Sequence, residues 1–210
     1  MFRKSIGCDK ISIKNGVIYK IEDNVKLDVN GIAQGFSVDI VTSYLRQKGL
    51  KDFLINIGGE VFCSGKKNKK PWLVAIEQPI LGAPSQKYIV QLSNKALATS
   101  GSYRKFQKLD DKIISHTINP KTLKPAENDL ISVSIMASTC MDADAYATVC
   151  MSMGLKDAKE FVKEKNIEAC FIYREDHDTL TFITSHLLDL ISPQSSDFSD
   201  LQSSLDIAPQ

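Results

Sequence analysis

The 210-residue sequence has no long hydrophobic run and almost no net charge. A transmembrane helix needs about 20 consecutive apolar residues, whereas every apolar run here is much shorter and is broken by charged, amide or glycine residues. A membrane-spanning segment is therefore not expected. Because 26 Lys and Arg nearly balance 25 Asp and Glu, no overall field attracts a nucleic-acid backbone, and nucleic acid is not an expected partner.

The sequence also lacks the signatures of secretion and of a disulfide framework. Its first residues lack the apolar block of about 7–15 residues that defines a secretory signal, so the chain as written is expected to be cytoplasmic. Its five cysteines are scattered without a CxxC pair, which argues against a zinc site and against a full set of disulfides. We expect them to be reduced and mostly buried.

The residues that are present have the composition of a globular protein, and their hydrophobic spacing predicts an α+β fold with a mixed, largely antiparallel sheet and a few packed helices. The predicted elements are a hairpin at 11–21, a helix at 31–48, strands at 53–57, 61–63, 72–76, 87–92 and 131–136, helices at 141–153 and 155–165, and strands at 168–173 and 180–183. The four strands between 53 and 92 are predicted to form an antiparallel meander, with the basic cluster 66–70 in a solvated loop. Residues 191–210 contain six Ser, three Asp, two Pro and no Lys or Arg, which predicts a disordered tail after a domain at 1–190.

The stretch LDVNGIAQGF, residues 27–36, is the first that offers chemistry to a ligand. Its two glycines, Gly31 and Gly35, bracket a predicted helix start, where unpaired N–H groups and the positive end of the helix dipole suit a phosphate. The alternative is an ordinary helix start in which Asp28 or Asn30 is the cap.

Two further stretches combine glycine with small polar residues. Gly58-Gly59 follows a predicted strand, which permits a ligand to approach the backbone closely and equally permits a tight turn. Thr99-Ser100-Gly101 supplies hydroxyl groups that suit phosphate or ribose. His116 lies shortly before the turn-forming Asn119-Pro120, and it is either a catalytic base or a structural hydrogen-bonding residue.

Asp144 and Thr148 are four residues apart and therefore share one face of a predicted helix. A carboxylate and a hydroxyl, with phosphate oxygens completing the coordination shell, match the oxygen ligands that Mg²⁺ prefers. The alternative is that Asp144 is a first-turn residue that stabilises the helix dipole and that Thr148 is a packing residue.

Five blocks occur in a fixed order along the chain: LDVNGIAQGFSVD, INIGGEV, LATSGSY, SHTINPKT and DADAYATVCMSMG. Taken together, they resemble the FAD:protein FMN transferase family, also called the ApbE-like flavin transferases. The resemblance implies Mg²⁺-dependent transfer of the FMN moiety of FAD onto a Thr or Ser hydroxyl of a target protein, a subunit of a flavin-dependent redox pump, with AMP as the leaving group. Alternatives are Mg²⁺-dependent hydrolysis of the FAD pyrophosphate and an inactive nucleotide-binding relative.

The resemblance also implies roles for particular residues. The metal ligands would be the backbone carbonyl of Ala33, the carboxylate of Asp144 and the hydroxyl of Thr148. Catalysis would depend on Asp144 and on His116, the latter as the general base that takes the proton of the acceptor hydroxyl. The flavin and nucleotide contacts would fall on Asp28, Gly31, Gly58, Gly59, Thr99, Ser100 and Gly101.

The chain departs from the family pattern in four respects. Family members usually carry a longer N-terminal segment with an export signal or lipid anchor, so this chain is expected to form the C-terminal two-thirds of the family fold, and the resemblance implies an exported, membrane-associated protein. Gln34 replaces a lysine of the first block. Asn119 replaces the aspartate of the usual HxxDP motif, and Leu123 replaces a glycine.

Overall fold

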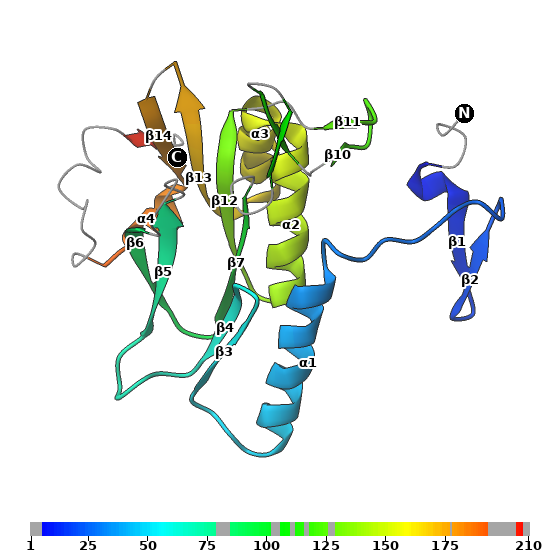
Figure 1. Cartoon of the computed structure of the whole chain (residues 1–210). Helices are drawn as coiled ribbons and strands as arrows, with labels where there is room; N and C mark the ends of the chain where they lie inside the picture. Colours follow the sequence, from blue (N-terminus) through cyan, green and yellow to red (C-terminus); the bar gives the residue numbers. More distant parts are fainter. Residues whose placement is uncertain are drawn as a thin grey trace.

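The fold is built in layers around a seven-stranded sheet (Figure 1). The computed structural model describes residues 6–78, 85–101, 106–109, 112–115, 118–125, 129–176, 178–192 and 205–207. From one edge to the other, the strands of the sheet are β15 (Leu205–Ile207), β14 (Asp178–Ile183), β13 (Glu168–Glu175), β12 (Leu130–Ala137), β7 (Lys95–Gly101), β4 (Glu60–Ser64) and β3 (Phe53–Ile57). All neighbouring strands are antiparallel except β14 and β15.

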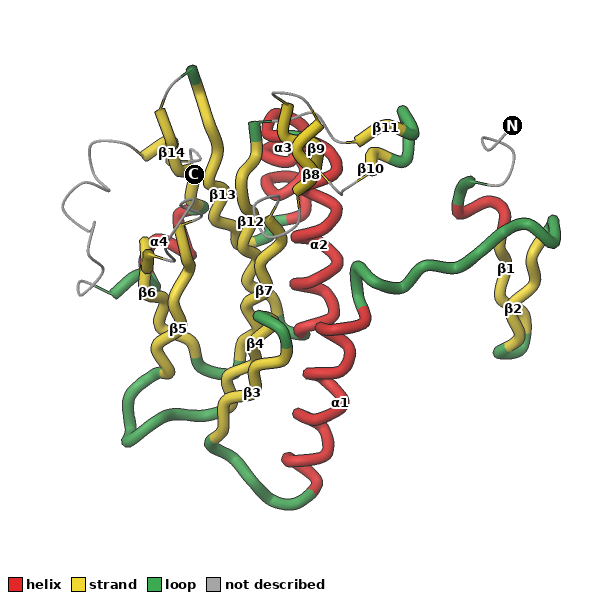
Figure 2. The backbone as a smooth tube through the Cα atoms, viewed as in Figure 1, coloured by secondary structure: helices red, strands yellow, loops and turns green. Residues whose placement is uncertain are grey.

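Three helices cover one face of the sheet, and α1 and α2 lie side by side along it (Figure 2). They are α1 (Ala33–Gln47), α2 (Cys140–Met153) and α3 (Leu155–Lys165). Alternate strand residues such as Ala96 and Ala98 on β7 face this layer and share a core with Ala143 and Ala147 of α2. Small residues on both sides allow the helix to lie close to the sheet, which brings α2 near the end of β7.

A second layer covers the opposite face of the sheet. It consists of the hairpin β5 (Trp72–Gln78) and β6 (Ser85–Leu92) together with α4 (Ser185–Asp189). The prediction of a meander between 53 and 92 is wrong, because β4 pairs with β7 and not with β5. The β5–β6 hairpin leaves the sheet and packs over side chains of the other face, including Val61, Cys63 and Leu97, which would otherwise be exposed.

Three two-stranded hairpins complete the described structure. They are β1 (Ile11–Lys14) with β2 (Val17–Lys20), preceded by a 3₁₀ turn at Cys8–Lys10, β8 (Phe106–Leu109) with β9 (Lys112–Ser115), and β10 (Ile118–Asn119) with β11 (Lys124–Pro125). The predicted hairpin at Asn15-Gly16 is confirmed: both residues have positive φ, 50° and 75°, as a two-residue type I′ turn requires. This hairpin projects away from the layers (Figure 1).

The predicted helices are confirmed, and the end of α1 follows the expected chemistry. Gly49 has a φ of 82°, its N–H donates to the carbonyl of Arg46, and the N–H of Leu50 donates to that of Leu45. This is a Schellman motif, with glycine at the left-handed position. Among the described helices, none is long and apolar enough to cross a membrane.

The segment 191–210 is only partly described. Ile191 and Ser192 are buried beside β6, with the Ser192 N–H donating to Ile89. Leu205–Ile207 form the parallel edge strand β15, so these residues are paired where a disordered tail is predicted. The other residues of 193–210 lie outside the described residues, and the domain boundary at 190 stays a prediction.

All five cysteines are free thiols, and all except Cys8 are buried. Burial raises the pKa of the Cys63 and Cys150 thiols to about 12. These thiols are therefore protonated near neutral pH and unreactive. The prediction of mostly buried cysteines is confirmed.

Candidate functional site

The candidate site lies where the N-terminus of α1 meets the middle of α2. The N–H of Gly35, in the first turn of α1, donates to Asp144 Oδ2 of α2 at 3.0 Å. A Cβ atom on Gly35 would collide with the backbone of Cys140, lying 2.7 Å from its carbonyl carbon and 2.8 Å from Asp144 Cβ. Only glycine permits this approach, so the sequence of α1 places a helix N-terminus directly against a carboxylate.

A second carboxylate fixes the start of α2. Asp39 of α1 accepts hydrogen bonds from the N–H groups of Cys140 and Met141, at 2.8 and 2.9 Å. Thr139 is the N-cap and accepts from the N–H of Asp142. Asp39 thus satisfies two of the N–H groups that would otherwise be unpaired at the start of α2. These bonds fix the position of α2 against α1.

The structure tests the capping and dipole roles given as alternatives for these two helix starts. Ile32 is the N-cap of α1, and Asp28 instead accepts from the N–H of Asn30 in a local turn. Neither Asp28 nor Asn30 therefore caps the helix. On α2 the first-turn acidic residue is Asp142, whereas Asp144 lies further along the helix. The dipole role proposed as an alternative for Asp144 therefore belongs to Asp142.

Three chain segments meet around Thr148. The Ser100 Oγ on β7 lies 3.3 Å from Thr148 Oγ1. Gly31, just before α1, is so close that a Cβ atom there would lie 3.2 Å from Thr148 Cγ2. Ala33 opens α1, and its carbonyl accepts from the Ser37 hydroxyl at 2.8 Å. The structure thus brings Gly31 and Ser100 to Thr148, one helical turn from Asp144.

Negative charge dominates this junction. Asp144 is 6% exposed, and burial raises the pKa of its carboxyl, an effect that the Gly35 N–H partly offsets. Asp39, Glu60 and Asp144 all raise the pKa of the neighbouring Cys140 thiol, after the larger effect of burial. Glu60, at the start of β4, is also 6% exposed. An anionic ligand would need a cation to bind here.

Gly58 and Gly59 form the tight turn between β3 and β4, with φ of 69° and 117°. The Gly59 N–H donates to Asn56 Oδ1 at 3.1 Å. The side-chain amide of Gln34 lies against Gly58, in the space that a Cβ there would occupy. The turn is therefore a neighbour of the α1 N-terminus, and Gln34 stands between the two.

Other predicted residues lie apart from this group. The Thr99 hydroxyl bonds to Ser134 at 2.7 Å and faces the opposite side of the sheet from Ser100, because successive strand residues alternate. Gly101 ends β7 beside Ser132, and Asp28 is exposed. His116 lies outside the described residues.

Of the two other departures from the family pattern, the one at Asn119 has a structural explanation and the one at Leu123 does not. Asn119 Oδ1 accepts from the N–H groups of Lys121 and Thr122, while its Nδ2 donates to the Ser152 carbonyl at 3.2 Å. An aspartate could not make this last bond, which ties the β10–β11 turn to α2. Leu123 has a φ of 61°, a conformation that glycine adopts without strain.

Sequence reasoning did not select Asp39, Glu60 or Gly35 as site residues. Glu60 carried a usable signal, since it is a carboxylate directly after two glycines and at the start of a strand that is buried throughout. Gly35 carried a signal as one of the two glycines that bracket the helix start, but nothing pointed to its contact with α2, and Asp39 carried none that could be separated from that of an ordinary surface helix residue.

The donor chemistry fits Mg²⁺. The Ala33 carbonyl, the Asp144 carboxylate and the Thr148 hydroxyl are all oxygen donors, and Mg²⁺ commonly takes one or two protein carboxylates with substrate phosphates completing its shell. Among the described residues, no Lys or Arg forms an ion pair with Asp144. No group of three or more His, Cys, Asp or Glu that could hold a metal occurs among those residues either.

The layered α+β fold and this helix junction define the class of the protein. The ApbE family model matches residues 1–171, and the chain belongs to the ApbE family. It is 33% identical over 167 residues to the FAD:protein FMN transferase of Buchnera aphidicola subsp. Schizaphis graminum, an alignment that covers 80% of this chain and 49% of that protein. It is 30% identical over 191 residues to that of Vibrio cholerae, covering 90% and 57%.

Solved structures agree with this assignment. The flavin transferase ApbE from Vibrio cholerae matches with a TM-score of 0.79 at 29% identity, over 90% of this chain and 60% of that chain. The apo form of Pseudomonas stutzeri flavinyl transferase ApbE matches with a TM-score of 0.80 at 32% identity, over 90% and 58%. The predicted fold class is confirmed. The chain spans about half the length of the curated relatives that it matches.

Proposed function

We propose that this chain transfers the FMN moiety of FAD onto a Thr or Ser hydroxyl of a target protein, with Mg²⁺ bound and AMP released. The observation that carries the proposal is the contact between Gly35 and Asp144. It joins the glycine-bounded N-terminus of α1 to the helix that carries Asp144 and Thr148. The names of the relatives, FAD:protein FMN transferase, support the same reaction.

In the proposed reaction, the acceptor hydroxyl oxygen bonds to the phosphorus of the FMN half of the pyrophosphate. The bond from that phosphorus to the bridging oxygen breaks, and AMP leaves. Bound Mg²⁺ would neutralise charge on the phosphoryl oxygens. Ala33, Asp144 and Thr148 would hold it, and His116 would take the hydroxyl proton.

The negative charge of the junction is a reason to expect that Mg²⁺ is required. The pyrophosphate of FAD is anionic, and the buried carboxylates of Asp144 and Glu60 would repel it. Gln34, at the position of the family lysine, cannot supply the missing positive charge. The bound cation would therefore be the principal neutralising charge at this junction.

The proposal is tested by incubating the full chain with FAD, with Mg²⁺ or with EDTA, and with a candidate acceptor protein. AMP is measured by chromatography, and covalent flavin is measured by fluorescence of the denatured acceptor on a gel. AMP and covalent flavin that both require Mg²⁺ are the expected result. AMP without covalent flavin would instead support pyrophosphate hydrolysis, and FAD binding without AMP would support an inactive relative.

Gln34→Lys is expected to tighten FAD binding about tenfold, because a charge-assisted hydrogen bond to phosphate is worth about 1–2 kcal/mol more than a neutral one. The lysine would extend from the first turn of α1 toward the Gly58 turn. Calorimetric titration with FAD measures the effect. Ile40→Lys, at a position 55% exposed on the same helix, is the control, and equal tightening in both variants would contradict a local role for residue 34.

A further inference from the structure

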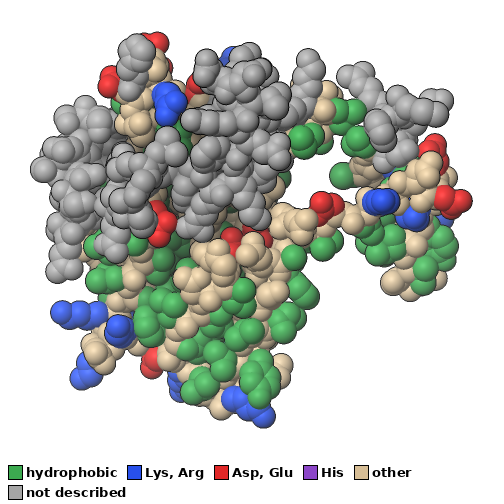
Figure 3. Space-filling model, in the orientation of Figure 1, with side chains coloured by type: hydrophobic (Ala, Val, Ile, Leu, Met, Phe, Trp, Pro, Cys, Tyr) green, Lys and Arg blue, Asp and Glu red, His purple; other side chains and the backbone are tan. Residues whose placement is uncertain are grey.

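The end of the molecule opposite to the helix junction is strongly basic. Three segments meet there: 46–52, from the last turn of α1 onward; 64–70, from the end of β4 toward β5; and 93–95, up to the first residue of β7. They contain Arg46, Lys48, Lys51, Lys66, Lys67, Lys69, Lys70 and Lys95, with Asp52 as their one acidic residue. Figure 3 shows Lys and Arg side chains gathered at this lower end. We call these three segments the basic end.

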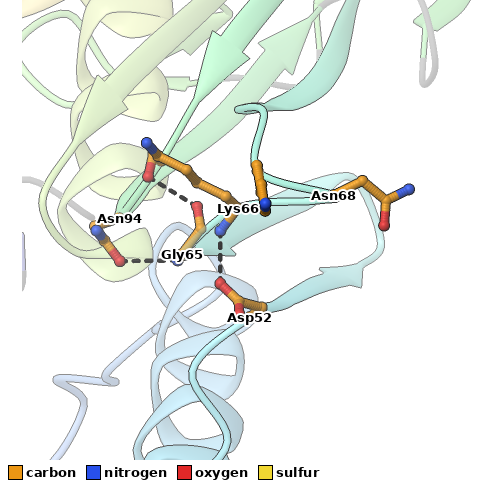
Figure 4. A pocket seen from close by; sticks show the side chains of 7 residues that line it. Asp52, Gly65, Lys66, Asn68 and Asn94 are labelled. Atoms are coloured by element: carbon orange, nitrogen blue, oxygen red, sulfur yellow. Dashed lines mark hydrogen bonds between the residues drawn. The ribbon is translucent and has the colours of Figure 1, made fainter.

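Hydrogen bonds hold the three segments together (Figure 4). The N–H of Lys66 donates to Asp52 Oδ1 at 2.8 Å, and the N–H of Gly65 donates to Asn94 Oδ1 at 3.0 Å. The Ser93 hydroxyl donates to the Gly65 carbonyl at 2.8 Å. A Cβ on Gly65 would lie 2.7 Å from the Lys51 carbonyl, so the close approach requires glycine. The basic end is therefore a built junction rather than a set of independent loops.

Two adjoining cavities open at this junction and share Gly65 and Asn94. The first, of about 620 Å³, is also lined by Asp52, Lys66, Asn68, Lys69 and Ser93. The second, of about 420 Å³, is also lined by Arg46, Gly49, Leu50, Lys51 and Ser64. Both are shallow and open to solvent, so a ligand bound there would stay partly exposed. Four basic residues and one acidic residue, Asp52, line these cavities. The Asp52 carboxylate already accepts a hydrogen bond from the Lys66 N–H.

The positive charges at the basic end are not neutralised within the described part of the chain, where none of the eight basic side chains forms an ion pair. Arg46 and Lys67 lie over the rings of Phe62 and Trp72, at 5.1 and 5.9 Å from the ring centroids. Eight like charges in one region repel one another. The whole chain carries a formal charge of only +1, so this excess of positive charge is local. A bound anion would reduce the repulsion among these side chains.

We propose that the basic end is a binding site for a phosphate-bearing ligand, separate from the candidate flavin-transfer site. Lysine ammonium groups bind phosphate oxygens as point charges, and the amide groups of Asn68 and Asn94 supply further donors at the cavity. The basic end begins in the last turn of α1, whereas the candidate site lies at the N-terminus of this helix, which has 15 residues and is about 22 Å long. The phosphate belongs either to a free small molecule or to a phospholipid headgroup.

The first arm of the test uses inorganic pyrophosphate as the probe, in low salt with EDTA so that no divalent cation is present. Amide chemical shifts of the full chain are followed by NMR. Saturable shifts are expected at residues 65–70 and 94, weakening as salt is raised. The second arm measures flotation of the chain with vesicles that contain about 30% anionic phospholipid, against vesicles of neutral lipid.

Both arms are repeated with Lys66→Glu/Lys69→Glu, a double charge reversal at exposed positions. Binding is expected to weaken at least tenfold. The control is Lys156→Glu/Lys163→Glu, which makes the same charge change at exposed positions of α3 and is expected to alter binding less than about twofold.

The pattern of results identifies the ligand source. Saturable pyrophosphate shifts that are lost in the double variant support a free phosphate-bearing ligand. Flotation on anionic vesicles without pyrophosphate shifts, again lost in that variant, supports a lipid headgroup. Binding in neither arm, or binding that the double charge reversal leaves unchanged, overturns the proposal.

Discussion

Asp144→Asn is expected to lower Mg²⁺-dependent AMP release from FAD by about 100-fold or more, and to raise the melting temperature of the metal-free protein. The loss of activity follows because the carboxylate is the one charged ligand in the proposed metal site, and removing one group that stabilises transition-state charge typically has this effect. The gain in stability follows because the structure buries this carboxylate, whose pKa is raised for that reason.

The pH dependence of the stability gain has a definite sign. The Asp144 carboxyl binds its proton more tightly in the folded state than its ordinary pKa of 3.8 implies. Its contribution to the free energy of unfolding therefore falls as pH rises from 3.8 toward the folded-state pKa, and it stays low above that value. Asn carries no charge, so the gain in melting temperature is expected near neutral pH and is expected to vanish in acid below 3.8.

Asp142→Asn is the matched control, two residues away on the same helix. Asp142 lies in the first turn of α2 and its Oδ2 accepts from the Thr139 hydroxyl at 2.6 Å. Its removal should lower the stability by about 0.5–1 kcal/mol and leave AMP release unchanged. The two variants thus differ in the sign of the stability change. Retained AMP release in Asp144→Asn, or a stability loss matching that of the control, would contradict the assignment.

The helices and the first hairpin were predictable from the sequence because their signals are local. Apolar residues every four positions (Ile32, Phe36, Ile40 and Tyr44) predict α1, although the structure leaves these side chains exposed and buries Val38 and Thr42 instead. Asn15-Gly16 specifies its turn through backbone preference alone. Strand pairing is not local. The hydroxyl-bearing residues Thr99 and Ser100 carry no local strand signal, and they form a strand because β12 pairs with them, while β4 pairs with the preceding residues 95–97 of β7.

The candidate site was predictable only where its signals are local in the sequence. Asp144 and Thr148 share a helix face, which spacing alone indicates. The contact between Gly35 and Asp144 joins residues 109 positions apart, and no periodicity within either helix implies it. The resemblance to the flavin transferases implied that residues of both helices bind one metal. It did not indicate Asp39, which holds α1 against the start of α2 by accepting from the N–H groups of Cys140 and Met141.

Gly35→Ala is expected to lower the free energy of unfolding by about 3 kcal/mol or more and to abolish Mg²⁺-dependent AMP release. Within a helix, alanine is ordinarily favoured over glycine by about 1 kcal/mol, so propensity alone predicts the opposite sign. The new Cβ would lie 2.7 Å from the Cys140 carbonyl carbon, and backbone atoms cannot rotate away as a flexible side chain can. Urea denaturation measures the loss of stability.

The collision would also act on the site itself. Moving α1 away from α2 breaks the Gly35 bond to Asp144 and strains the two bonds from α2 to Asp39. Gly49→Ala is the control at the other end of α1, where a Cβ meets nothing within 4 Å but φ is 82°. It should cost about 1 kcal/mol through backbone strain and leave AMP release intact. If both variants lost equal stability, the loss in Gly35→Ala would not be due to a collision with α2. The close contact between α1 and α2 would then not depend on glycine at position 35.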